Sequence, residues 1–134
     1  MSAAWGLRAP KQTEKPICIV DDDEGVADSL RTLLETFGFS VLSYSSGGEF
    51  LADERRRMAG FLVIDYQMPG MNGLDVFENL QKQGIRVPTV LISGRLDANT
   101  RERAARMGVG EIVEKPFAPG RLIELIRTNL PEAD

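Results

Sequence analysis

Short apolar runs alternate with longer amphipathic stretches from residue 16 to residue 130, and few folds accommodate this pattern. Three of the runs are apolar almost throughout, as strands buried on both faces must be: residues 17–20, 61–64 and 89–92. Two others include polar residues, as edge strands do: residues 40–45 and 110–114. The alternation is typical of strand-helix units wound into a parallel sheet. We therefore predict a doubly wound α/β domain with five strands.

The order of the strands follows from which of them lie at the edges. With the second and fifth strands outermost and every crossover right-handed, the expected order is 2-1-3-4-5, with helices on both faces of the sheet. This is the flavodoxin-like order, in which ligands bind at the carboxyl ends of the first and third strands. Glycines at 38, 84 and 108 are expected to end three of the helices. We expect residues 1–15 and 131–134 to be tails.

Composition limits the classes of function. A chain of 134 residues with 43% apolar residues and a net charge of -4 fits one globular domain and argues against nucleic-acid or membrane-surface binding. Histidine is absent, which excludes catalytic triads and histidine-based zinc sites. The one cysteine, Cys18, is interpreted as a buried, inert thiol. Without an apolar leader or a run long enough to span a membrane, the cytoplasm is the expected location.

Acidic residues gather where the predicted strands end. Asp21 and Asp22 directly follow the first strand, and Asp65 follows the third, so three carboxylates are expected to meet at one edge of the sheet. Such a cluster needs a counter-charge, and Mg²⁺ suits carboxylate oxygens and phosphate. Ser93 follows the fourth strand and Lys115 the fifth, so a hydroxyl and an ammonium can hold phosphoryl oxygens at the same edge.

Neighbouring residues are given structural roles. Asp23 and Glu24 are interpreted as a helix N-cap and a first-turn charge, not as metal ligands. Residues 55–57, three arginines, are expected to close the second helix and to face water. Residues 68–70 and Gly73 are interpreted as turn residues. Met71 and Phe117 are expected to pack in or around the core.

Four motifs behind four predicted strands resemble those of bacterial response-regulator receiver domains. The motifs are VDDD at 20–23, IDYQMPGMNG at 64–73, LISG at 91–94 and EKPF at 114–117. The resemblance covers residues 16–130 and implies a two-component signalling protein of the chemotaxis type. Its partners would be a sensor histidine kinase or a phosphotransfer protein, and a downstream protein that the sequence does not identify.

The resemblance also implies a role for each site residue. Asp65 would accept the phosphoryl group, Asp21 and Asp22 would hold Mg²⁺, and the main-chain carbonyl of Gln67 would add a ligand. Ser93, followed by Gly94, would be the switch hydroxyl. Lys115 would pair with the acids and then with the phosphate, and its bond to Pro116 is cis in the family. The protein would be a phospho-acceptor with intrinsic autophosphorylation and autodephosphorylation chemistry, not an enzyme.

At one position the sequence departs from the family. Most receivers have Tyr or Phe three residues before the lysine, whereas this chain has Ile112. A β-branched side chain has few rotamers and cannot reproduce the swing of a ring. We expect a phosphoryl group to move residues 93–97 and the start of the fourth helix instead. The change would reach a face made by the fourth helix, fifth strand and fifth helix, which is also the expected surface of a homodimer.

Three alternatives remain open. The spacing of Asp21 and Asp23 is similar to that of haloacid-dehalogenase phosphatases, but Gly25 stands where that motif has Thr or Val, and no cap domain fits in the chain. A scaffold that has lost phosphorylation would not need the intact site. The third alternative is a receiver cut from a larger transcription factor. We expect a stand-alone receiver, because only residues 131–134 follow the last predicted helix, 121–130.

Overall fold

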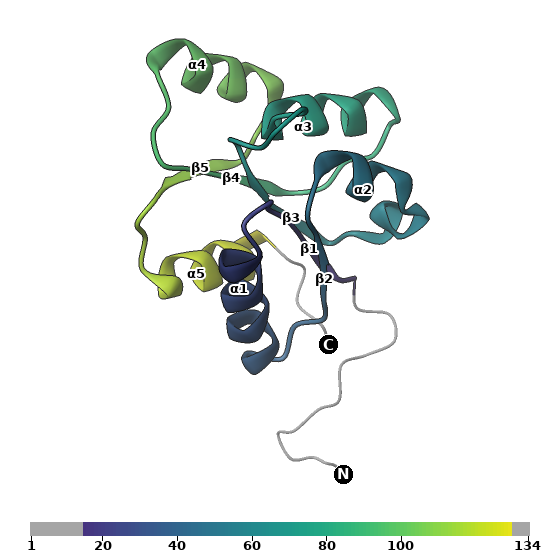
Figure 1. Ribbon diagram of the computed structural model, residues 1–134, viewed down its shortest axis with the longest axis vertical. Helices are drawn as coiled ribbons and strands as arrows, with labels where there is room; N and C mark the ends of the chain where they lie inside the picture. Colours follow the sequence, from purple (N-terminus) through teal and green to yellow (C-terminus); the bar gives the residue numbers. More distant parts are fainter. Residues whose placement is uncertain (1–14, 130–134) are drawn as a thin grey trace.

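The computed structural model describes residues 15–129, which form one parallel sheet between two layers of helices (Figure 1). The sheet has 5 strands in the order β2-β1-β3-β4-β5. Helices α1 and α5 cover one face, and α2, α3 and α4 cover the other. The predicted doubly wound, flavodoxin-like fold is confirmed, and β2 and β5 are the edges.

The strands are β1 (Ile17–Val20), β2 (Val41–Tyr44), β3 (Phe61–Asp65), β4 (Thr89–Ser93) and β5 (Glu111–Glu114). The helices are α1 (Glu24–Thr36), α2 (Gly47–Ala52), the 3₁₀ helix η1 (Glu54–Met58), α3 (Gly73–Lys82), α4 (Ala98–Met107) and α5 (Pro119–Asn129). Except for Lys15, the predicted tails (1–15 and 131–134) lie outside the described residues. The predicted end of the last helix at residue 130 also lies outside them.

The sheet divides the apolar core into two clusters because successive side chains of a strand point to opposite faces. Along β1, Ile17 and Ile19 pack on the side of α1 and α5, whereas Cys18 and Val20 pack on the side of α2, α3 and α4. All four side chains are at most 1% exposed. This burial on both faces explains the uninterrupted apolar runs of the central strands.

The helix ends agree with the sequence. Gly38, Gly84 and Gly108 have positive φ angles of 91°, 75° and 91°, the left-handed conformation that ends a helix. Asp23 is the N-cap of α1, and its side chain accepts a hydrogen bond from the N–H of Val26 at 3.1 Å. The predicted glycine stops and the Asp23 cap are therefore confirmed.

The interpretation of residues 55–57 was wrong in two respects. They lie in η1, not at the end of α2, and Arg56 is only 7% exposed. Its Nε donates to Oε1 of Gln83 at 3.0 Å, and its Nη1 donates to the carbonyl of Asp53 at 3.1 Å. A run of three arginines gives no sign that its middle member is buried, because the acceptor Gln83 is distant in the sequence.

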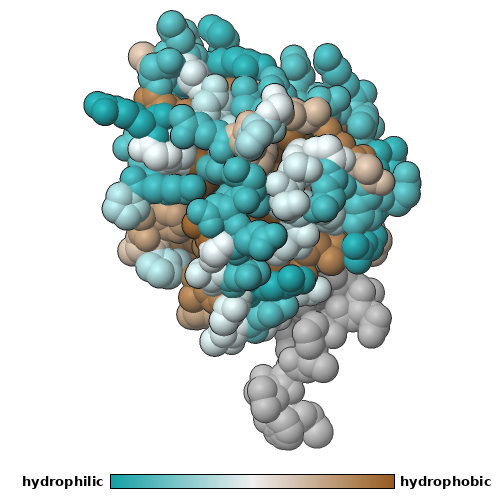
Figure 2. Space-filling view, in the orientation of Figure 1, coloured by the Kyte–Doolittle hydropathy of each residue, from teal (hydrophilic) through white to brown (hydrophobic). Residues whose placement is uncertain are grey.

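The visible surface of the domain is more polar than its interior. Hydrophilic side chains predominate on the face shown in Figure 2, with smaller hydrophobic areas between them. Among residues 15–129, no helix combines the length and the apolarity needed to cross a membrane.

Cys18 is fully buried, and this burial raises the pKa of its thiol to about 12, which agrees with an inert thiol. Met71 and Phe117 pack against the two clusters, as expected.

Candidate functional site

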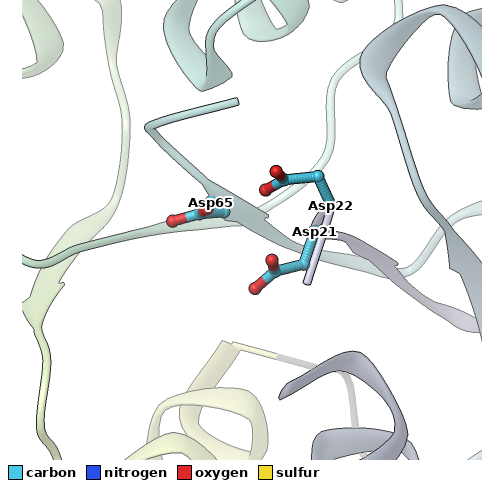
Figure 3. A group of neighbouring side chains, drawn as sticks. All are labelled: Asp21, Asp22 and Asp65. Carbon is cyan, nitrogen blue, oxygen red and sulfur yellow. The ribbon is translucent and has the colours of Figure 1, made fainter. Parts of the chain in front are cut away.

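Three carboxylates meet where β1 and β3 end. Asp65 is the last residue of β3, and Asp21 and Asp22 directly follow β1, which pairs with β3 in parallel. One oxygen from each of the three side chains lies within 4.8 Å of the others. Figure 3 shows the carboxylates on the same side of the two strand ends. The parallel register therefore brings together acids that are far apart in the sequence.

Burial and mutual repulsion raise the pKa values of two of these acids. Asp65 is 6% exposed and Asp21 is 3% exposed. Desolvation, followed by the negative charge of Asp21, raises the pKa of Asp65 to about 6. Desolvation also raises the pKa of Asp21. The site therefore places negative charge where it is costly, which is an arrangement suited to a bound cation.

Backbone contacts hold one member of the acid pair, Asp21, in place. The N–H of Asp23 donates to Oδ1 of Asp21 at 2.9 Å, and the N–H of Asp21 donates to the carbonyl of Tyr44 in β2 at 3.1 Å. Asp22 has no such role and is exposed. The buried Asp21 is thus held in place, while Asp22 faces the solvent beside it.

The ammonium group of Lys115 faces the acids. Nζ of Lys115 lies 3.4 Å from Oδ1 of Asp65. Lys115 follows β5, and its N–H donates to the carbonyl of Ser93 at 2.8 Å, so the ends of β4 and β5 are joined beside the site. The bond from Lys115 to Pro116 is cis, as the resemblance implies. Within residues 15–129, the ammonium of Lys115 is thus the positive charge paired with the cluster of three carboxylates.

The hydroxyl of Ser93 is bound within its own loop. Its oxygen accepts from the N–H of Arg95 at 3.1 Å and donates to the carbonyl of the same residue at 3.2 Å. Ser93 is fully buried. The one hydrogen that the hydroxyl can donate is thus engaged with the loop that leads to α4.

Gly73 lies against the backbone of Asp65 in a way that the sequence interpretation missed. It is not a turn residue but the first residue of α3, and its N–H donates to the carbonyl of Tyr66 at 2.9 Å. A Cβ at this position would lie 2.7 Å from the backbone oxygen of Asp65 and 2.8 Å from Cδ1 of Leu91. Only glycine allows this close approach. Gly70, in contrast, has a φ of 80° and is a turn residue, as expected.

The other predicted site residues lie around this centre. Gln67 is exposed, two residues after Asp65. Gly94 is exposed and has no atom within 4 Å of the position of an added Cβ. Ile112 is half-buried and packs against the cluster on the side of α3 and α4. The roles of these three residues in metal binding and switching stay predictions.

The donor set fits Mg²⁺. The three clustered side chains offer only oxygen ligands, as this ion prefers, and two of them are buried carboxylates with raised pKa values. The nearby ammonium and hydroxyl are suited to phosphate oxygens. The arrangement can therefore hold a divalent cation and a phosphoryl group side by side at Asp65.

Comparisons with known proteins agree with this geometry. The family model described as the response regulator receiver domain matches residues 17–127. The response regulator protein TodT of Pseudomonas putida is 37% identical over 125 residues, which are 93% of this chain and 55% of TodT. The transcriptional regulatory protein FixJ of Rhizobium meliloti is 36% identical over 114 residues, 85% of this chain and 56% of FixJ. This chain thus spans about half the length of these relatives.

A solved structure extends the likeness to three dimensions. The crystal structure of FixJ-N has a TM-score of 0.78 and 33% sequence identity, and the match covers 90% of this chain and 98% of that one. The similarity in three dimensions therefore extends over most of the chain.

Proposed function

The chain belongs to the response regulator receiver domain family, and from this premise we propose that it accepts a phosphoryl group on Asp65. The donor would be a sensor histidine kinase or a phosphotransfer protein. The observation that supports this proposal best is the buried Asp65 carboxylate, which lies among two further acids and 3.4 Å from the ammonium of Lys115. The modification would change a protein-binding face formed by α4, β5 and α5.

The residues of the chain supply the parts of a phosphoryl transfer. An oxygen of ionised Asp65 forms a bond to phosphorus while the bond from phosphorus to the donor's imidazole nitrogen breaks. The electron pair of that bond leaves with the imidazole, which departs as a neutral ring after protonation. Lys115 neutralises the incoming oxygens, and Ser93 donates to one of them after leaving Arg95.

The metal would be held by Asp21, Asp22, Asp65 and the carbonyl of Gln67. When bound, Mg²⁺ supplies positive charge beside the phosphoryl oxygens. The pKa of about 6 at Asp65 means that the carboxylate is mostly ionised at pH 7 even without the ion, so the nucleophile is in its reactive form.

We propose an acceptor and not an enzyme with turnover. The product is an acyl phosphate, which hydrolyses, so the signal decays. A haloacid-dehalogenase type of phosphatase is the alternative, and it would release phosphate steadily from a small phosphomonoester. Retention of one phosphoryl group per chain would favour the acceptor over the phosphatase.

The output is proposed to pass through a protein surface. FixJ is a transcriptional regulatory protein of roughly twice this chain's matched length, which supports a receiver joined to an output domain as a second candidate. A stand-alone receiver acting on another protein stays a prediction, as do the cytoplasmic location, the homodimer and the absence of nucleic-acid binding. The stand-alone receiver and the receiver joined to an output domain would both be phosphorylated on Asp65.

The test is direct phosphorylation. The protein is incubated with acetyl phosphate and Mg²⁺, and intact mass spectrometry is expected to show one added phosphoryl group that hydroxylamine removes. Asp65→Asn is expected to remain unlabelled. Equal labelling of Asp65→Asn, or no labelling of the parent protein by acetyl phosphate or by any histidine kinase of its source, would contradict the proposal.

A further inference from the structure

Helix α4 combines a small apolar contact, in which Met107 packs partly buried against the cluster that contains Ala104, with several polar contacts. Of its ten residues only Ala104 is a buried hydrophobic residue. Nε2 of Gln81 in α3 donates to the carbonyl of Met107 at 2.6 Å, and Arg103 lies 3.9 Å from the carboxylates of two α3 residues, Asp75 and Glu78. Because little apolar area holds the helix, even weak polar contacts can influence its position. Hydrophilic residues also predominate in Figure 2 over the region where α4 lies in Figure 1.

One further contact of α4 reaches the phosphoryl site. Arg101 forms a hydrogen-bonded ion pair with Glu114, the last residue of β5. Glu114 is the register partner of Ser93 in the sheet and directly precedes Lys115. Arg101 is thus bound to the residue that lies between the two groups expected to contact phosphate.

The beginning of α4 is tied to the same site by a second route. The hydroxyl of Ser93 is bonded to the backbone of Arg95, and Asp97, two residues later, is the N-cap of α4. The helix is therefore connected to β4 through its N-terminal loop and to β5 through Arg101. When the Ser93 hydroxyl donates to a phosphoryl oxygen instead of the Arg95 carbonyl, the first connection loses one of its two hydrogen bonds and the Arg101–Glu114 pair remains.

We propose that the Arg101–Glu114 pair holds α4 against β5 in the unphosphorylated protein and positions Lys115, so that it opposes the switch to the phosphorylated conformation. This inference rests on the proposed function. Arg101 is a positioning residue, because it acts on the site through Glu114 and Lys115. The two side chains are 43% and 50% exposed, so the pair is a weak one. Its removal is expected to shift the equilibrium by about two- to fivefold.

The experiment compares Arg101→Ala and Glu114→Gln with two control variants. Arg106→Ala removes a pair within α4, with Glu102 at 3.6 Å, that does not touch β5. Arg121→Ala removes a pair at the other end of β5, with Glu111 at 3.4 Å. A doubly substituted protein, Arg101→Glu with Glu114→Arg, restores the pair with its charges exchanged.

Backbone amide shifts are measured first without metal or phosphoryl donor. Arg101→Ala and Glu114→Gln are expected to move the signals of Ser93, Arg95 and Lys115, whereas the controls leave these signals unchanged. Beryllofluoride with Mg²⁺ is then titrated as a phosphoryl mimic. The concentration that half-saturates these signals is expected to fall about two- to fivefold in both variants and to return to the parent value in the charge-exchanged protein.

The two measurements separate the two proposals. If Arg101→Ala and Glu114→Gln are indistinguishable from the controls in the metal-free spectra and in the titration, the inference is overturned. If the parent protein does not respond to beryllofluoride, the proposed function fails, and the metal-free spectra still decide whether Arg101 positions Lys115.

Discussion

Replacement of Asp65 by asparagine should stabilise the metal-free protein, and the gain should depend on pH. The folded state raises the pKa of Asp65 from its ordinary value of 3.8 to about 6. Each pKa unit corresponds to about 1.4 kcal/mol, so ionised Asp65 costs the folded state about 3 kcal/mol. Asparagine has nearly the same shape and does not ionise, so Asp65→Asn is free of this cost.

The sign of this pH dependence follows from the linkage between proton binding and folding. A raised pKa means that the protonated acid is favoured in the folded state, so the contribution of Asp65 to stability is complete below pH 3.8 and is lost as the pH rises to about 6. The difference in unfolding free energy between Asp65→Asn and the parent should therefore grow from near zero at pH 4 to about 3 kcal/mol at pH 7.

The assay is urea denaturation of both proteins between pH 4 and pH 7.5 in the presence of a chelator. Asp97→Asn is the matched control, because the N–H of Thr100 donates to Asp97 at 2.7 Å and lowers the pKa of that carboxyl. Its pH dependence should have the opposite sign. A stability difference for Asp65→Asn that does not change with pH, or that favours the parent at pH 7, would refute the reasoning.

Three further substitutions test neighbouring features. Asp22→Asn should weaken Mg²⁺ binding in a calorimetric titration without lowering the urea midpoint of the metal-free protein, and a lower midpoint would show that Asp22 is structural. Gly73→Ala should destabilise the protein by about 1–3 kcal/mol and reduce labelling by acetyl phosphate, whereas Gly94→Ala should do neither at that scale. Arg56→Ala should cost about 1–3 kcal/mol in urea denaturation, whereas Arg57→Ala should stay within about 0.5 kcal/mol, and equal losses would contradict the role of the buried guanidinium.

The fold was predictable because its main determinants are local and periodic. Buried parallel strands must be apolar on both faces, and the two edge strands need not be, so the runs together with right-handed crossovers indicate the order of the sheet. The gathering of Asp21, Asp22 and Asp65 followed from that order, since the ends of neighbouring parallel strands lie together.

Features that depend on contacts between distant segments were not predictable. In the sequence Gly73 resembles a turn glycine. The need for glycine at this position arises only because α3 begins against the backbone of Asp65. Arg56 is indistinguishable in sequence from the exposed Arg57, and its burial depends on acceptors supplied by Gln83 and Asp53. The Arg101–Glu114 pair likewise depends on how α4 lies against β5.

The pairing of β1 with both β2 and β3, and of β3 with β4, has a kinetic consequence. Asp21 and Asp65 approach each other only after two long connections have closed, so their repulsion is absent from the unfolded chain. Long-range parallel pairing forms slowly, and contacts that form after the rate-limiting step affect the unfolding rate more than the folding rate. If the contact between Asp21 and Asp65 forms after that step, a cation bound at these strand ends would slow the opening of the sheet while leaving its assembly nearly unchanged. The lifetime of the folded domain would then vary with the state of its site.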